Sequence, residues 1–246
     1  MKQKIRFDCL LHMQYPEFSR RTIQQFIVQG HAFINGAVLC KPGQGVCAGS
    51  QVFLDAEKPK FVSRAGFKLE AALHAWSIVV EGMVCMDAGI STGGFTDCLL
   101  QRGAQRVYGI DVGHGQLDPK IAYDDRVILL EKTNLRTLTS LAELVDIVTL
   151  DLSFISVVKV MEAVERFLKN DGTLLILIKP QFEVEGHLIG RGGIVKNDEV
   201  RNTAVQKVIA GVQVYGFIFQ GVMQSPLSGA DGNIEFLAHF KKIKKL

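Results

Sequence analysis

The sequence predicts an α/β fold in which helices cover both faces of a mostly parallel sheet, preceded by a small α+β domain. From residue 64 onward, short apolar runs alternate with amphipathic segments, which is typical of repeated strand–helix units. The first of these runs, residues 83–87, breaks into a glycine-rich turn before a helical segment. Residues 1–57 instead combine helical segments with Asn-Gly and Pro-Gly turns, which favour hairpins.

Composition sets the outer limits of this interpretation. The chain has 246 residues, 48% of them hydrophobic and 22% charged, as expected for a folded globular protein. We expect domains at 1–57 and 64–246, joined by a charged linker at 58–63. No apolar run reaches the roughly 18 residues that span a bilayer, and we expect no signal peptide. Five cysteines without a C-x-x-C pair predict no disulfide framework and no metal site, and they favour the cytoplasm.

Positive charge is concentrated near the N-terminus. Residues 1–60 contain eight Lys or Arg and four Asp or Glu, whereas the whole chain has a net charge of +3. A basic segment on a near-neutral body indicates a module that faces a polyanion. The alternative is an ordinary solvated surface.

The order of elements in residues 1–57 carries a first resemblance. We expect helices at 5–12 and 20–29, the second capped by Ser19 and ended by Gly30, then a hairpin at 32–39 and a strand at 51–54. This pattern resembles the alpha-L RNA-binding domain, through Arg6, Asp8, Leu11, Ser19, Arg20, Gly30, Val38 and the turns at 35–36 and 41–43. The resemblance implies contacts with structured RNA from Arg6, Arg20, Arg21 and Lys41. A dimerisation or folding appendage is the alternative.

The larger domain is expected to contain seven strands and four long helices. The strands are predicted at 83–87, 106–110, 127–130, 146–150, 173–178, 217–223 and 233–240. The helices are predicted at 64–76, 95–102, 156–168 and 198–214, with a turn at 170–172 and a long loop at 181–197. The resulting architecture is a Rossmann-like sheet.

The glycine-rich turn indicates which cofactor this sheet binds. A dinucleotide site needs G-x-G-x-x-G, whereas Gly89, Gly93 and Gly94 are spaced G-x-x-x-G-G. This spacing, with Asp111 ending the next strand, is typical of S-adenosylmethionine sites in class I methyltransferases. The residues expected at the cofactor are Asp87, Gly89, Ser91, Thr92, Gly93, Gly94, Phe95, Asp111, Asn134 and Asp151. An ordinary turn whose glycines supply positive φ is the alternative.

Four ionisable residues follow or precede elements on the cofactor side of the sheet. They are Lys68, Asp151, Lys179 and Glu235. Asp151 and Lys179 are predicted at the carboxyl ends of neighbouring strands. Because a lone buried charge is costly, these groups are expected to be functional or paired. A structural ion-pair network is the alternative.

Motifs along nearly the whole chain resemble the TlyA family of ribosomal RNA 2'-O-methyltransferases, which join an alpha-L domain to an FtsJ-like methyltransferase core. The motifs are SRAGFKL, DAGISTGGFTDCLLQRGA, DVGHGQL, EKTNLR, DLSFIS, IKPQFEV, GGIV and SPLSGADGNIEF. The resemblance implies methylation of a ribose, in a cytidine, on ribosomal RNA or ribosomal subunits.

The same resemblance implies a catalytic set of Lys68, Asp151, Lys179 and Glu235. Lys179 would assist loss of the 2'-hydroxyl proton, and Asp151 would orient it. Lys68 would act on Lys179 by like charge and help to place the hydroxyl, while Glu235 would hold Lys68. Alignment of hydroxyl, methyl and sulfur would supply much of the acceleration.

Three other functions are compatible with parts of the sequence. A base N-methyltransferase would use residues 151–154, DLSF, as a loose form of its D/N-P-P-Y/F motif. A non-catalytic ribosome-assembly factor would keep the fold alone, and a cytolysin would need a membrane-active segment. The target nucleotide, the ribosomal subunit and the oligomeric state stay open.

Overall fold

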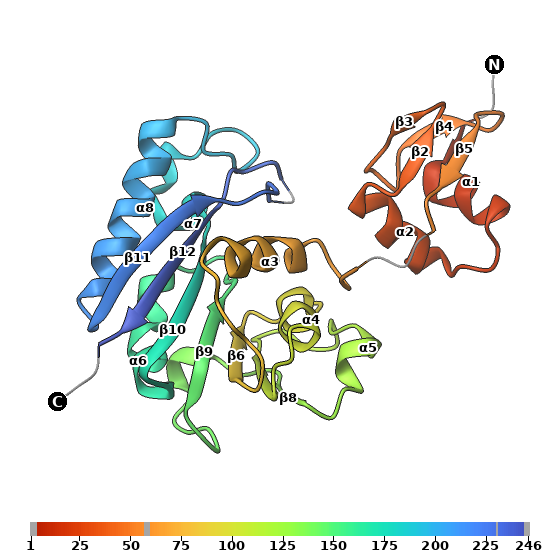
Figure 1. Cartoon of the computed structure of the whole chain (residues 1–246). Coiled ribbons are helices and arrows are strands. Elements are labelled where there is room, and N and C mark those ends of the chain that lie inside the picture. The colour runs from red at the N-terminus through yellow and green to blue at the C-terminus, as the bar shows by residue number, and fades with distance from the viewer. Residues whose placement is uncertain (1–3, 57–59, 230, 244–246) are drawn as a thin grey trace. The chain divides into compact units, whose positions relative to one another are not determined.

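The computed structural model describes residues 4–56, 60–229 and 231–243. Contacts divide the chain into two compact units, Met1–Ser63 and Arg64–Leu246 (Figure 1). The predicted linker 58–63 falls partly outside the described residues. We describe each unit by itself.

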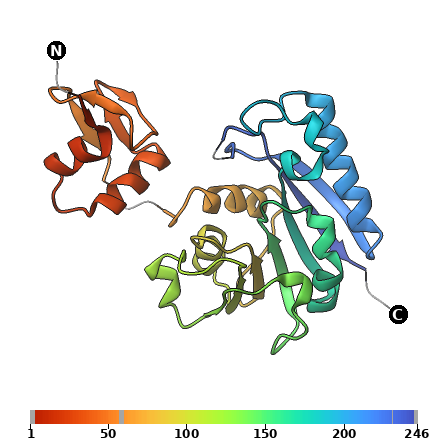
Figure 2. The same ribbon diagram turned by 180° about the vertical axis from the view of Figure 1, so that it is seen from behind.

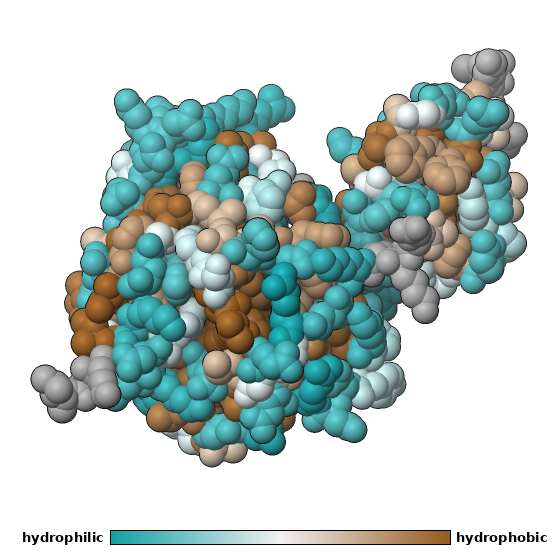
Figure 3. Space-filling view, viewed as in Figure 1, coloured by the Kyte–Doolittle hydropathy of each residue, from teal (hydrophilic) through white to brown (hydrophobic). Residues whose placement is uncertain are grey.

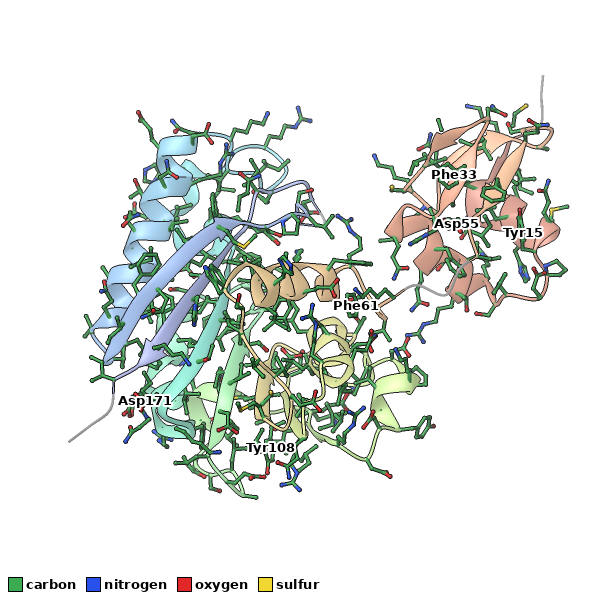
Figure 4. All side chains as sticks on the ribbon, viewed as in Figure 1. Tyr15, Phe33, Asp55, Phe61, Tyr108 and Asp171 are labelled. Carbon is green, nitrogen blue, oxygen red and sulfur yellow. The ribbon has the colours of Figure 1, made fainter. Side chains whose placement is uncertain are left out.

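The N-terminal unit is a small α+β domain. Its elements are β1 (Lys4–Arg6), α1 (Phe7–Gln14), α2 (Arg20–Gln29), β2 (Ala32–Ile34), β3 (Ala37–Val38), β4 (Gly45–Cys47) and β5 (Val52–Leu54). One sheet has the order β3-β2-β5, and β1 pairs with β4. Phe7, Leu11, Ile23, Phe26 and Ile27 are buried between helices and strands. Tyr15, labelled in Figure 4, accepts a hydrogen bond at its hydroxyl from the Leu54 N–H at 3.2 Å.

Local signals in this unit act as predicted. The Ser19 hydroxyl accepts the Thr22 N–H at 3.1 Å, which caps α2, and Gly30 ends the helix at a φ of 87°. Asn35 and Gly36 both have positive φ, as a two-residue hairpin turn requires. The predicted first helix, however, begins two residues late. Residues 4–6 form β1 instead, because they pair with β4, a strand that the sequence did not predict.

The C-terminal unit is built on a seven-stranded sheet. Its order is β11-β12-β10-β9-β6-β7-β8, with β10, β9, β6, β7 and β8 parallel and β12 antiparallel to both neighbours. The strands are β6 (Val84–Ala88), β7 (Arg106–Ile110), β8 (Val127–Leu130), β9 (Val145–Leu150), β10 (Leu168–Ile178), β11 (Phe217–Gln224) and β12 (Phe236–Lys242). The predicted α/β fold class is confirmed.

Helices lie on both faces of this sheet. They are α3 (Ala65–Ala75), α4 (Gly94–Gln101), α5 (Pro119–Ala122), α6 (Met161–Phe167), α7 (Pro180–Glu183) and α8 (Asp198–Gln213), with 3₁₀ turns η1 (Leu135–Thr137), η2 (Val157–Val160) and η3 (Gly186–Leu188). Figures 1 and 2 show α6 and α8 on one face and α3 and α4 on the other. Buried Val164, Val208 and Val212 pack on strand residues such as Met86 and Ile176. Burial of both sheet faces accounts for the apolar runs in the parallel strands.

Several boundaries in this unit differ from prediction. The helix predicted at 156–168 is divided into η2 and α6, and the loop predicted at 181–197 contains most of α7 and the turn η3. The residues predicted to turn at 170–172 lie inside β10, where the register with β9 shifts between Leu168 and Thr173. The last strand, predicted at 233–240, begins later, at Phe236, and continues past the predicted end to Lys242. Lys242 is buried because its ammonium group donates to the Leu168 carbonyl at 2.7 Å, beyond the end of α6.

On the face shown in Figure 3, hydrophilic residues surround the exposed apolar ones. Among the described residues, no helix combines the length and the apolar character needed to cross a bilayer. Within the same residues, His, Cys, Asp and Glu side chains form no group of three that could hold a metal ion.

Candidate active site

The glycine-rich turn joins the end of β6 to the start of α4. Gly89 has a φ of 85°, and a Cβ placed on it would lie 2.4 Å from the main-chain oxygen of Asp151. Any side chain would therefore clash with the segment that follows β9, and it would also strain the left-handed backbone. Glycine at this position lets the turn lie directly against the neighbouring strand end.

A cavity of about 480 Å³ opens beside this turn. Five of the predicted cofactor residues line it: Gly89, Ser91, Asp111, Asn134 and Asp151. Apolar side chains complete the wall, among them Ile110, Val112, Leu135, Leu152 and Val160. Mostly apolar walls with a few polar groups are typical of small-molecule sites.

Asp111 shapes the cavity through the main chain on either side of it. Its Oδ2 accepts the Ser91 N–H at 2.9 Å, and its Oδ1 accepts the Gly113 N–H at 2.8 Å. The carboxylate thereby joins the turn after β6 to the turn after β7. Each oxygen retains a further lone pair that can accept a ligand hydroxyl.

The other predicted cofactor residues, Asp87, Thr92, Gly93, Gly94 and Phe95, are not among those lining the cavity. Asp87 is fully buried and accepts hydrogen bonds from the Thr96 hydroxyl at 2.7 Å and the Thr149 hydroxyl at 3.0 Å. Burial raises the pKa of Asp87 to about 7, against the opposing effect of these two hydrogen bonds. Asp87, at the end of β6, therefore connects this strand to α4 through Thr96 and to β9 through Thr149, on the side of the turn away from the cavity.

Lys179 and Asp151 form an ion pair at the rim of the cavity. The Lys179 Nζ lies 2.6 Å from Asp151 Oδ1 and donates a hydrogen bond to the Ser153 hydroxyl at 3.0 Å. The side chains are 12% and 18% exposed, so the pair is accessible to a substrate but largely shielded from water. Such shielding strengthens the attraction between the two charges.

Lys68 and Glu235 form a second pair. Lys68 lies in the first turn of α3, and its Nζ is 2.5 Å from Glu235 Oε2, with both residues buried. The mildly unfavourable position of a lysine at a helix start is thus compensated by a direct carboxylate partner. Removing either partner would leave the other charge buried alone.

The sheet register brings the two ion pairs to the same end of the sheet. Ile178 of β10 lies opposite Phe236 of β12, so Lys179 and Glu235 occupy the next position on adjacent strands. Leu150 is paired with both Ile176 and Ala88, which places Asp151 between β10 and Gly89. Because adjacent strands lie about 4.8 Å apart, the ion pairs and the cavity lie at the same end of the sheet, beyond the carboxyl ends of the parallel strands.

Two residues that the sequence did not single out lie on the segments that carry Asp151 and Lys179. Phe154 is 91% exposed, has a φ of 65° and lines the cavity, with its ring centroid 5.1 Å from that of Phe182. Glu183 is buried at the end of α7, and its Oε1 accepts the Val157 N–H at 2.9 Å. The only sign of them in the sequence is that Phe154 lies in the motif DLSF with Asp151 and Glu183 lies in the motif KPQFE with Lys179.

The basic residues predicted to bind RNA fall into two groups. Arg6 and Arg20 both contact the buried Asp8 carboxylate, at 2.9 and 3.1 Å. Hydrogen bonding from Arg6 outweighs burial and holds the pKa of Asp8 well below its usual range. Arg21 and Lys41 are exposed at the surface. One carboxylate thus offsets part of the charge of the first group, while the second group faces solvent.

Comparison with known proteins gives concordant matches. The FtsJ-like methyltransferase family matches residues 61–242. The chain is 40% identical over 240 residues to the 16S/23S rRNA (cytidine-2'-O)-methyltransferase TlyA of Mycobacterium tuberculosis, covering 96% of this chain and 89% of that protein. It is 38% identical over 239 residues to hemolysin A of Brachyspira hyodysenteriae, covering 96% and 99%.

A solved structure described as a hemolysin from Streptococcus thermophilus also matches. Its TM-score is 0.77 at 38% identity, and the match covers 100% of this chain and 90% of that one. The similarity extends through both units, and the FtsJ-like match includes Lys68, Asp151, Lys179 and Glu235 within its range. The chain therefore belongs to the FtsJ-like methyltransferase family, and within it to the TlyA group.

Proposed function

We propose that this protein transfers the methyl group of S-adenosylmethionine to the 2'-hydroxyl of a ribose, in a cytidine of ribosomal RNA. The observation that carries the proposal is the Lys179–Asp151 pair at the rim of the cofactor cavity, with the Lys68–Glu235 pair at the same sheet edge. The name of the Mycobacterium tuberculosis relative supports the choice of a cytidine ribose. An rRNA substrate is consistent with a cytoplasmic location.

The cavity suits the proposed methyl donor. Its ionisable lining residues are Asp111 and Asp151, both acidic, so a pyrophosphate would find no cationic partner among the residues that line it. A sulfonium cation is favoured by the same two carboxylates. Asp111 would accept ribose hydroxyls, and Asn134 with the apolar wall would hold the adenine. When bound there, S-adenosylmethionine supplies an electrophilic methyl group.

Lys179 would activate the acceptor. In its neutral form, the Nζ would accept the proton of the 2'-hydroxyl while the ribose oxygen takes the methyl group that bound S-adenosylmethionine supplies, with S-adenosylhomocysteine as the leaving group. Asp151, 2.6 Å away, then stabilises the ammonium group that forms. Lys68, held by Glu235, would place the hydroxyl from the side of α3. Alignment of the reacting atoms by these fixed groups supplies a further part of the acceleration.

Phe154 would receive the acceptor nucleotide. An aromatic ring that is almost fully exposed at the cavity offers a flat surface on which a base can stack. Its left-handed backbone is unfavourable for a bulky residue, and such strain is concentrated at functional sites. We therefore place the target base over Phe154, with its ribose toward Lys179.

The other functions make different predictions. A base N-methyltransferase would not need Lys179 or Glu235, and a non-catalytic assembly factor would need no catalytic residue at all. The matches to rRNA methyltransferases do not favour the cytolysin. The decisive test incubates the protein with tritiated S-adenosylmethionine and ribosomal subunits. We expect label in a nuclease-resistant 2'-O-methyl dinucleotide, whereas label on a base would refute the proposal.

The N-terminal unit would hold the RNA through exposed cations. Replacing both Arg21 and Lys41 by alanine should weaken binding to ribosomal subunits several-fold and reduce the salt dependence by about one phosphate contact per residue. Arg6 and Arg20 are poorer probes, since their removal uncovers buried Asp8. Arg166→Ala, a surface change in the other unit, serves as the control. An unchanged salt slope in the double variant would contradict this assignment.

A further inference from the structure

Two chain segments carry the acceptor side of the site. Residues 151–157 follow β9 and hold Asp151 and Phe154, while residues 179–183 follow β10 and hold Lys179 and Phe182. Besides the Lys179 contacts and the Phe154–Phe182 ring contact, the Glu183 carboxylate connects them: its Oε1 accepts the Val157 N–H at 2.9 Å, and the Ser156 side chain also hydrogen-bonds to it. These bonds lie at the far end of both segments from β9 and β10.

The described residues that precede Val157 in the chain provide no acceptor for its N–H group. Val157 begins η2, and Ser156 at the capping position makes no side-chain capping bond. The first N–H groups of a helix have no partner within the helix. Glu183, from a separate segment and only 3% exposed, supplies the missing acceptor. Glu183 is thus the last residue of the segment 179–183, and its carboxylate caps the helical turn η2, which begins at the end of the segment 151–157.

Glu183 is itself anchored to the body of the unit. The Lys207 ammonium, on α8, donates to the Glu183 carbonyl oxygen at 2.8 Å. Helix α8 is fixed on the sheet by buried Ala204 and Val208. The position of Glu183 is therefore set by α8, and through Val157 it sets the path of residues 151–157.

We infer that Glu183 is a positioning residue, which holds Asp151 and Ser153 at the distance from Lys179 that methyl transfer requires. The inference rests on the proposed function, because it gives the Lys179–Asp151 pair a catalytic role. Residues 151–157 are also held by the Asp151 N–H bond to the Ala88 carbonyl at 3.0 Å and by the packing of Leu152 and Val157 in the core. The Glu183 bond therefore supplies the polar contact at the end of the segment away from β9. Displacement by about 1 Å is enough to lower a rate by about 100-fold.

One carboxylate oxygen performs this role. Burial raises the pKa of Glu183, against hydrogen bonding from Ser156 and Val157 and the charges of Lys207 and Lys159. Glu183 Oε2 has no hydrogen-bond partner among the described residues. An amide oxygen can accept the Val157 N–H equally well. Glutamine should therefore replace Glu183, whereas an apolar side chain of similar size should not.

The test compares Glu183→Gln, Glu183→Leu and Val157→Pro. The last variant removes the donor N–H, and proline is tolerated at the first position of a helical turn. The matched control is Asp146→Leu, which also removes a carboxylate that accepts a main-chain N–H group. Asp146 Oδ2 accepts the Val84 N–H at 3.0 Å where β6 and β9 begin, at the end of the sheet away from the site. For each protein we would measure kcat, KM, the Kd of S-adenosylmethionine, urea stability and the pH dependence of kcat.

Glu183→Leu and Val157→Pro should lower kcat by about 10- to 100-fold and shift its pH profile, with little change in the Kd of S-adenosylmethionine. Glu183→Gln should stay near the wild type, and Asp146→Leu should lose stability without a shifted profile. If Glu183→Leu does not fold, Val157→Pro alone decides.

An unchanged kcat in folded Glu183→Leu or Val157→Pro would overturn the inference, as would equal impairment of the glutamine and leucine variants. Failure of the wild type to methylate a ribose would instead count against the proposed function.

Discussion

The two sides of the site are built differently. On the donor side, a glycine turn and main-chain N–H groups held by the Asp111 carboxylate shape the cavity, and the buried Asp87 lies behind the turn without lining it. On the acceptor side, side chains meet directly, as two lysine–carboxylate pairs at 2.6 and 2.5 Å. The donor side depends on close packing and backbone conformation, whereas the acceptor side depends on the charges of its side chains. The two should therefore fail in different measurements.

The largest effect is expected from the acceptor side. Lys179→Ala removes the group that would accept the hydroxyl proton, so kcat should fall by about 100- to 10,000-fold. The Kd of S-adenosylmethionine, measured by calorimetry, should change little, because Lys179 is not among the residues lining the cavity. A variant that methylates at the wild-type rate would remove Lys179 from the mechanism. A lost cofactor affinity would show that the two sides are not separable.

The donor side should break at Gly89. In Gly89→Ala, the new methyl group meets the Asp151 carbonyl oxygen, and the residue must keep a φ of 85°. Cofactor binding should weaken by about tenfold or more, since left-handed backbone alone costs about 1–2 kcal/mol. Gly186→Ala is the control, because no atom lies within 4 Å of its Cβ position. Equal cofactor affinity in the two variants would contradict the steric account.

Phe154 sharpens the comparison within the acceptor side. Loss of base stacking costs about 1–3 kcal/mol per base, so Phe154→Ala should raise KM for ribosomal subunits by about 5- to 100-fold. Tyr123→Ala provides the control, because Tyr123 is similarly exposed, at 86%, but does not line the cavity. Steady-state kinetics with subunits as the varied substrate would measure this. Equal KM values for the two variants would exclude stacking on Phe154.

Asp87 gives the smallest effect, in stability and not in rate. Burial raises its pKa from 3.8 to about 7, so the folded state holds a proton that the unfolded state loses. Its contribution to the unfolding free energy should therefore decrease as pH rises from about 4 to about 7. Asp87→Asn cannot ionise, and relative to the wild type it should gain about 1 kcal/mol between pH 5 and 6. The unfolding free energies of the two proteins would be measured with urea at several pH values. The same pH dependence in both proteins would contradict this assignment to Asp87.

The sequence predicted best where local rules decide the structure. The Ser19 cap, the Asn35-Gly36 hairpin and the strands that end at Ile110 and Leu130 follow from nearest neighbours in the chain. Strands β1 and β4 were missed because their pairing joins segments about 40 residues apart. The residues predicted to turn at 170–172 do leave the regular pairing, with Asp171 at a φ of 58°, but the strand already begins at Leu168, whose pairing with Val145 local signals do not show.

The site was predictable in its residue types but not in its division of labour. Strand ends on one side of a parallel sheet must converge, which brings Asp151 near Lys179. Sequence could not show that Asp87 faces the interior, since an acid after an apolar run fits either a cavity or a buried cluster. It also gave no sign that Glu183 connects two loops, because that contact depends on how α7 turns.

Mapping of ribose methylation tests the central claim most directly. Ribosomal RNA from cells that lack this protein would be compared with RNA from cells that express the wild type or Lys179→Ala. We predict that the wild type restores a 2'-O-methyl group at a cytidine and that Lys179→Ala does not. A wild type that adds no ribose methyl group, or a Lys179→Ala variant that restores it fully, would contradict the account.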